Sequence, residues 1–175
     1  MTFPTPSQDA IKHSQALIQQ IKILGETISF HDYMRAVLYS PLGYYSAGSA
    51  KFGEAGDFIT APECSSLFGK TLAHAIMPAL QKLDTPIVFE LGAGSGKLAG
   101  DILTELNTQN NLPNEYWILE PSADLQARQQ IYLQTTLPAF FDHIHWLSEL
   151  PKHDFEGVIL GNEVVDALPV HRFEI

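Results

Sequence analysis

The stretch VFELGAGSGKL, residues 88–98, joins a short apolar run containing one acidic residue to a turn with three glycines. An apolar run of this length, bounded by turn residues, is typical of a buried strand. A glycine-rich turn between a strand and a helix lets the main chain approach a ligand closely, and the first helical turn offers unpaired N–H groups. We therefore predict a strand at 87–91, a ligand-binding turn at 92–96 and a helix from residue 97.

The chain after this turn continues to alternate between two patterns. Short apolar runs at 116–120, 144–147 and 157–161 predict three more strands. Amphipathic spacing predicts helices at 97–109 and 122–133. Strands that alternate with helices indicate an α/β fold with a doubly wound, mostly parallel sheet that is covered on both faces.

The segment before the turn predicts helices and a long ordered loop. Apolar spacing indicates helices at 7–24 and 30–39, the second capped by Ser29 with Asp32 three residues on, whereas residues 43–61 lack a stable period. Long loops inside compact domains are uncommon and usually functional. We expect residues 1–62 to form an N-terminal helical segment with a lid loop, and residues 63–175 to form the N-terminal half of the main domain.

A helix that follows the loop has a clear start signal. Thr60 and Glu63 have the spacing of a capping box, with a proline inside the first turn. This predicts a helix from Thr60 to about Leu83. Its buried stripe would consist of Phe68, Leu72, Ile76, Ala79 and Leu83.

The bulk composition restricts the class of protein. The 175 residues are 45% hydrophobic and 17% charged, which is ordinary for one soluble globular domain. No run approaches the roughly 18 apolar residues that span a bilayer. Residues 1–13 show neither a signal-peptide nor a transit-peptide pattern, so we expect a cytoplasmic, bacterial setting.

Charge and cysteine content argue against two further kinds of site. The formal net charge of −10 opposes binding to a nucleic-acid backbone. Cys64 is the single cysteine, so an internal disulfide is impossible and a cysteine-based zinc site has too few ligands. We predict no metal site.

Three glycine patterns compete to explain residues 92–96. The dinucleotide fingerprint G-x-G-x-x-G requires a third glycine where this chain has Lys97. The phosphate-binding P-loop requires a glycine at Leu91 and a hydroxyl side chain at Leu98. The third pattern is an acid, then G-x-G-x-G, then a second acid that closes the next strand. It resembles the S-adenosylmethionine (SAM) site of Rossmann-like, class I methyltransferases.

The second acid of this pattern is Glu120. It lies 24 residues after Gly96, near the offset expected of a carboxylate that holds ribose hydroxyls. A carboxylate accepts two hydroxyl hydrogen bonds at once, which suits a vicinal diol. Glu90 would then face the cationic methionine end of the cofactor, directly or through water. The alternative is that both acids merely end strands and pair with local lysines.

Four stretches closely resemble the MidA family of SAM-dependent methyltransferases, which includes the mitochondrial complex I assembly factor. They are LYSPLGYYS at 38–46, GDFITAPE at 56–63, ELGAGSGKL at 90–98 and NEVVDALPV at 162–170. The resemblance covers the chain from about residue 28 onward. Ala93 stands where the family often has proline, which affects the stiffness of the turn more than its chemistry.

The resemblance implies a class I methyltransferase fold and methyl transfer from SAM to a protein side chain. In the mitochondrial member the acceptor is an arginine of a complex I subunit, so an arginine and a respiratory-complex partner are the expectations here. Bacterial relatives would be cytoplasmic and eukaryotic ones mitochondrial. Family members have the strand order 3-2-1-4-5-7-6 and continue further, so we expect this chain to stop after the fourth strand.

Candidate site residues follow from the glycine turn and from the resemblance. For catalysis, Glu163 and Asp166 would grip a basic acceptor, because carboxylates pair with the planar guanidinium, and Asn162 would orient them. Asp166 has an alternative role as the cap of a turn. The expected cofactor-binding residues are Glu90, Gly92, Ala93, Gly94, Gly96, Glu120, Asp57 and Thr60.

Two other functions remain as alternatives. The first is a non-catalytic, truncated SAM-binding fragment or interaction module. The edge of its fourth strand would be exposed, which invites pairing in a homodimer or with another chain. The second is a nucleotide-binding oxidoreductase, which Lys97 disfavours.

Overall fold

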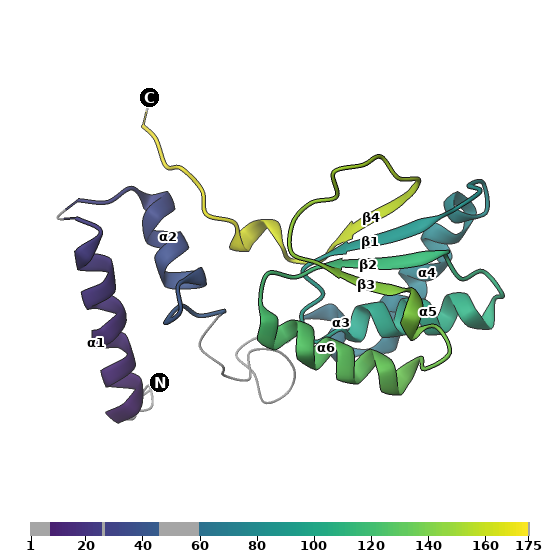
Figure 1. Cartoon of the computed structure of the whole chain (residues 1–175), viewed down its shortest axis with the longest axis horizontal. Coiled ribbons are helices and arrows are strands. Elements are labelled where there is room, and N and C mark those ends of the chain that lie inside the picture. The colour runs from purple at the N-terminus through teal and green to yellow at the C-terminus, as the bar shows by residue number, and fades with distance from the viewer. Residues whose placement is uncertain (1–7, 26, 46–59, 175) are drawn as a thin grey trace. The chain divides into compact units, whose positions relative to one another are not determined.

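The glycine turn, residues 92–96, follows the first strand of a four-stranded parallel sheet. The strands are β1 (Ile87–Leu91), β2 (Glu115–Leu119), β3 (Ile144–Leu147) and β4 (Gly157–Gly161). Their order in the sheet is β3-β2-β1-β4, and each neighbouring pair is parallel (Figure 1). This confirms the predicted α/β class and the order 3-2-1-4 for the first four strands.

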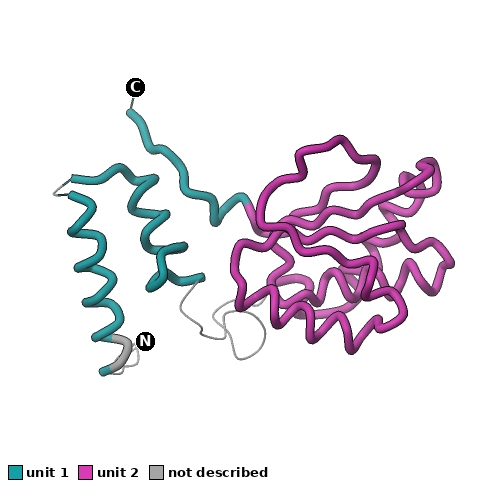
Figure 2. Tube along the Cα trace, in the orientation of Figure 1, with its two compact units in different colours: residues 1–48, 165–175 teal, residues 49–164 magenta. Residues whose placement is uncertain are grey.

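The computed structural model describes residues 8–25, 27–45 and 60–174. The chain divides into two units (Figure 2). Unit 1 consists of residues 1–48 and 165–175, and unit 2 consists of residues 49–164. The boundary at residues 62 and 63 that the sequence suggests stays a prediction.

Unit 2 packs its helices against one face of the sheet (Figure 1). Its helices are α3 (Ala61–Cys64), α4 (Ser66–Leu80), α5 (Lys97–Thr108) and α6 (Ala123–Thr136), and a short 3-10 helix, η1 (Phe141–His143), precedes β3. Val88, Tyr116 and Ile118 share the pleat that faces α4, α5 and α6, and all three are fully buried with them in one apolar core. The core therefore anchors both strand ends that precede the candidate site.

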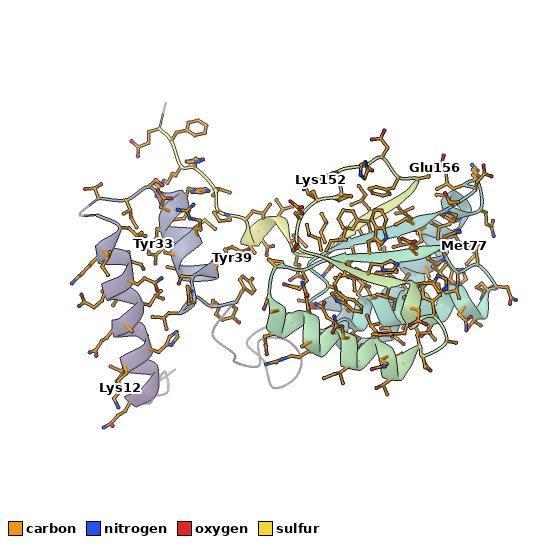
Figure 3. All side chains as sticks on the ribbon, in the orientation of Figure 1. Lys12, Tyr33, Tyr39, Met77, Lys152 and Glu156 are labelled. Carbon is orange, nitrogen blue, oxygen red and sulfur yellow. The ribbon has the colours of Figure 1, made fainter. Side chains whose placement is uncertain are left out.

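The opposite face of the sheet is covered by a loop instead of a helix. Phe89 and Trp117 are partners in the register of β1 and β2, and Phe155 packs against both rings. Phe155 belongs to the connection between β3 and β4, which also carries Lys152 and Glu156 (Figure 3). The expected coverage of both faces is thus only partly met: residues 148–156, a span too short for a crossover helix, cover β1 and β2, whereas Ile159 of β4 stays 60% exposed.

The single helix predicted from Thr60 to Leu83 is instead two helices, the second of which ends at Leu80. Ser65 has extended backbone, at φ −164° and ψ 143°, and separates α3 from α4. The Ser65 hydroxyl accepts a hydrogen bond from Leu67 N and so caps α4. The buried face of α4 also differs from the predicted stripe, sharing only Ile76 with it: Gly69, Ala73, Ile76 and Leu80 are buried.

Close helix packing explains that shift. A Cβ on Gly69 would lie 2.5 Å from Cβ of Asp101 on α5. Glycine at this position lets α4 and α5 approach each other, and the buried stripe follows the glycine rather than Phe68, which stays half-buried.

Unit 1 contains helices α1 (Gln8–Ile23) and α2 (Phe30–Tyr39) and the 3-10 helix η2 (Val165–Ala167). Ser29 caps α2 by accepting a hydrogen bond from Asp32 N, as its sequence position predicts. The Tyr39 hydroxyl donates to the Ala167 carbonyl over 2.8 Å, which ties η2 to α2. No helix in the described part of the chain is long and apolar enough to cross a membrane.

Candidate cofactor site at the glycine turn

The glycine turn has a backbone that only glycine adopts without strain. Gly92, Gly94 and Gly96 have φ values of +63°, +55° and +84°, all in the left-handed region. An L-residue there costs about 1–2 kcal/mol per position. Gly92 N donates to Leu119 O and Gly96 N donates to Ala93 O, so the turn is fixed to β2 and within itself. The predicted turn between the strand and the helix is therefore confirmed, and its role in binding a ligand stays a prediction.

The space beside two of these glycines is filled by the protein. A Cβ on Gly92 would lie 3.3 Å from Cγ2 of Val164, and a Cβ on Gly96 would lie 3.4 Å from Cγ of Gln129. The sequence argument that each glycine leaves room for a ligand is therefore not supported where a side chain at Gly92 or Gly96 would point, because Val164 and Gln129 lie there. The backbone conformation of these two glycines is the reason for glycine at both positions, and contact with a cofactor through their main chain stays a prediction. Ala93, between them, is buried.

Glu120 lies at the carboxyl end of β2, beside the glycine turn. Leu91 and Leu119 are register partners, so the residues that follow them leave the sheet at the same edge. The Glu120 side chain is only 4% exposed. Its Oε1 accepts from Ser122 N over 2.9 Å, and its Oε2 accepts from Gln129 Nε2 over 3.4 Å. The start of α6 thus holds this carboxylate in place.

Gln129 joins Glu120 to the glycine turn. Its Nε2 also donates to the carbonyl of Gly94 over 2.9 Å. The sequence analysis missed this residue, although a signal exists: Leu125, Gln129 and Leu133 recur every four residues and form the buried stripe of α6. A glutamine in the centre of an otherwise apolar stripe indicates a polar partner inside the fold.

Glu90 is buried on the helix-covered face of the sheet. It is 2% exposed, and its Oε2 accepts a hydrogen bond from the Tyr116 hydroxyl over 2.8 Å. Burial raises the pKa of Glu90 to about 7, although the hydrogen bond from Tyr116 acts to lower it. Burial and the neighbouring carboxyl raise the pKa of Tyr116 well above its ordinary value. Contact between Glu90 and a cofactor stays a prediction.

The segment expected to form a lid reaches the glycine turn through Glu63. The Ser95 hydroxyl donates to Oε1 of Glu63 and accepts from Lys97 N. Thr60 is the N-cap of α3 but makes no side-chain capping bond, so the predicted capping box is wrong. The Glu63 carboxylate binds Ser95 in place of the cap. Asp57 lies outside the described residues.

The expected catalytic residues fall in two units. Asn162 is half-buried and Glu163 is exposed, and both directly follow β4, the other neighbour of β1. Glu163 has φ +52°, a left-handed conformation that is uncommon for glutamate and is found at functional sites. Val164, next along the chain, contacts the Gly92 position. Residues 162–164 therefore lie at the same sheet edge as the glycine turn.

Asp166 belongs to unit 1, where it lies in η2. Burial, and secondarily the charge of Asp166, raises the pKa of Tyr45. Tyr45 stacks with Tyr39, their ring centroids 5.5 Å apart. Asp166 therefore lies near a tyrosine cluster within its own unit, and its predicted role in catalysis stays a prediction.

The described residues contain no group of three or more histidine, cysteine, aspartate or glutamate side chains placed to hold a metal ion. The groups that the structure gathers at the candidate site are carboxylates, one amide and the glycine backbone. A buried carboxylate beside a tight glycine turn fits a nucleoside, whose ribose offers two neighbouring hydroxyls.

Comparison with known proteins agrees with this geometry. Residues 71–175 match a family model described as "Putative S-adenosyl-L-methionine-dependent methyltransferase". A Burkholderia thailandensis protein, crystallised bound to S-adenosyl-homocysteine, superimposes with a TM-score of 0.86 at 44% sequence identity. That alignment covers 96% of this chain and 46% of the other chain.

Curated relatives carry a more specific name. The mitochondrial protein arginine methyltransferase NDUFAF7 homolog of Drosophila melanogaster is 31% identical over an aligned length of 198, gaps included, and the alignment covers 98% of this chain and 45% of the fly protein. Human mitochondrial protein arginine methyltransferase NDUFAF7 is 31% identical over an aligned length of 184, gaps included, and the alignment covers 90% of this chain and 41% of the human protein. The chain thus spans less than half the length of these relatives.

These matches confirm the predicted family and its cofactor. The family model covers more than half of the 175 residues. The chain therefore belongs to this family of S-adenosyl-L-methionine-dependent methyltransferases.

Proposed function

We propose that this chain binds SAM at the glycine turn and supplies the cofactor-binding half of an enzyme that methylates a protein arginine. One observation carries the proposal: the Glu120 carboxylate and the Gly94 carbonyl both accept hydrogen bonds from the side-chain amide of Gln129. Two cofactor-binding elements of the sequence pattern are thereby brought together at the carboxyl edge of a parallel sheet, where this class of fold binds its ligands.

The residues present fit the cofactor in kind. Glu120 is a buried hydrogen-bond acceptor for the ribose hydroxyls, and the exposed Gly92 and half-buried Gly94 would offer main chain to the rest of the nucleoside. Glu90 supplies a second carboxyl for the methionine end. When bound, SAM supplies an electrophilic methyl group on a sulfonium.

Glu163 and Asn162 are proposed to serve the methyl acceptor. A carboxylate at Glu163 would pair with a guanidinium, orient one nitrogen toward the methyl group and receive the proton that this nitrogen loses. Alignment of the two reacting atoms is the main task in a transfer of this kind. An arginine acceptor is supported by the names of the relatives and by the acidity of the chain, at a net charge of −10.

The finer expectations remain proposals. A protein substrate follows from the arginine acceptor, and a respiratory-complex subunit follows from the family resemblance of the sequence motifs. A cytoplasmic location stays a prediction from the sequence.

Binding and transfer are tested in separate experiments. Calorimetric titration of the chain with S-adenosylhomocysteine (SAH), the demethylated product, should give saturable binding near one per chain, and no binding would contradict the cofactor site. Methyl-labelled SAM should then transfer label to an arginine-rich peptide and not to a matched lysine-rich peptide. Glu163→Gln should lower transfer at least tenfold and leave SAH affinity unchanged.

A second candidate function is favoured by the exposed edge of β4. A chain that binds SAH but transfers no label would be a cofactor-binding module without catalytic activity. The two experiments therefore distinguish the proposed enzyme from this alternative.

A further inference from the structure

Gln129 is a buried polar residue of unit 2 that the sequence motifs do not include. It is fully buried, at 0% exposed. Its amide makes hydrogen bonds to three residues: Nε2 donates to Gly94 O and to Glu120 Oε2, and Oε1 accepts from Trp146 Nε1 over 2.9 Å.

The chemistry of the tryptophan sets the orientation of this amide. An indole N–H is a donor only, so the atom that faces Trp146 must be the amide oxygen. The amide NH2 group then faces Gly94 and Glu120, both of which present acceptors. Each polar atom of the side chain is matched, and the reversed amide would place a donor against a donor and an acceptor against a carboxylate.

An apolar residue would be sufficient if Gln129 served the core alone. Its neighbours along the α6 stripe are Leu125 and Leu133, both buried. A buried amide costs free energy unless its hydrogen bonds are made, so its presence in this stripe has to be explained by the groups it binds. Those groups are the carbonyl of a left-handed glycine and the carboxylate at the end of the next strand.

We infer that Gln129 is a positioning residue for the cofactor, which aims the Glu120 carboxylate at the ribose hydroxyls and holds the carbonyl of Gly94 in the glycine turn. The inference rests on the proposed function, because it assumes that the nucleoside binds at Glu120. Gln129 touches the two cofactor-binding elements and acts on the ligand through them. Trp146 acts one step further away, since it fixes the amide.

The test uses a variant that removes the amide at nearly constant volume, Gln129→Met, in the full chain. The matched control is Gln130→Met, which changes the exposed neighbouring glutamine on the same helix. Two probes are titrated by calorimetry, SAH and its 2′-deoxy analogue, which lacks one ribose hydroxyl. The wild type should prefer SAH by about tenfold or more, the usual effect of one hydrogen bond to a charged group.

Gln129→Met should bind SAH at least tenfold more weakly, and its preference for SAH over the deoxy analogue should fall to about threefold or less. Gln130→Met should match the wild type in both respects. General loosening of the fold would weaken both probes equally and leave the preference unchanged, so an unchanged preference overturns the inference while SAH binding by the wild type still supports the proposed function. No SAH binding by the wild type overturns both.

A second variant covers the case in which Gln129→Met does not fold. Trp146→Phe keeps an aromatic ring and removes the N–H that orients the amide. It should reduce the preference for SAH over the deoxy analogue in the same direction, by a smaller factor. A folded Trp146→Phe protein with the preference of the wild type would overturn the inference.

Discussion

The hydroxyl of Tyr116 donates a 2.8 Å hydrogen bond to Oε2 of Glu90 between two neighbouring strands, with both side chains buried. Glu90 belongs to the motif that marks the glycine turn, yet its carboxyl lies inside the core. Burial of the carboxyl has a measurable consequence for stability, because it raises the pKa of Glu90 to about 7 from 4.5.

The first prediction concerns the dependence of stability on pH. The folded protein holds the proton of Glu90 more tightly than the unfolded chain does, so the free energy of unfolding falls as the pH rises from about 4.5 to about 7 and then levels off. Glu90→Gln should lack this decline. The free energy of unfolding of the variant minus that of the wild type should therefore be larger at pH 8 than at pH 4, by on the order of 3 kcal/mol. Urea unfolding across this pH range measures the effect.

A matched control for Glu90 is Glu156→Gln, which changes an exposed glutamate and should keep the decline of the wild type. Tyr116→Phe should steepen the decline, because it removes a hydrogen bond that lowers the pKa of Glu90. A wild type whose stability is constant between pH 4.5 and pH 7 would contradict the assignment.

The second prediction concerns Gly94, which has φ +55°. Gly94→Val should destabilise the chain by about 1–2 kcal/mol or more and abolish SAH binding, because the side chain strains the backbone that we propose contacts the nucleoside. Gly25→Val is the control: it also changes a glycine with positive φ, at +141°, but in unit 1. It should lower the melting temperature and leave SAH affinity intact. Equal affinity of the wild type and Gly94→Val would contradict the site.

The third prediction concerns the strain at Glu163. Glu163→Gly should stabilise the protein by up to about 1 kcal/mol, because glycine adopts φ +52° without steric cost, and it should abolish methyl transfer. Asn110→Gly is a matched control, since Asn110 has the same φ of +52°. The Asn110→Gly protein should be as stable as the wild type or more stable, and its methyl transfer should be unchanged. Full activity in Glu163→Gly would show that the side chain at 163 is not needed.

The fourth prediction concerns the open edge of the sheet. β4 is the last strand in the order β3-β2-β1-β4, and Ile159 at its centre is 60% exposed. An exposed apolar edge strand promotes pairing between chains. We expect this chain to self-associate at micromolar concentrations, and Ile159→Lys to reduce that association. Light scattering measures it, and a monodisperse wild-type monomer would argue against an edge interface.

Much of the fold could be predicted because the signals are local. Apolar runs with turn residues at each end define β1, β3 and β4 at the bounds that the structure shows, and Ser29 with Asp32 starts α2 as predicted. The helix predicted from Thr60 to Leu83 was only partly correct, since Ser65 caps a separate helix and Glu63 binds Ser95 instead of capping α3. Capping spacing identifies possible partners and does not say which of them a side chain will choose.

Within the candidate site, local signals identified the glycine turn and Glu120, since left-handed backbone demands glycine and parallel strands end at a common edge. The sequence order alone therefore carries the fold class and the location of the candidate site. Gln129 and the environment of Glu90 depended on the tertiary structure. The contacts of Gln129 come from residues 35 positions before it and 17 positions after it in the chain, and the pKa of Glu90 depends on how completely other elements exclude water from it. Periodicity along one element contains no information about such contacts, because they arise only when strands and helices pack against each other.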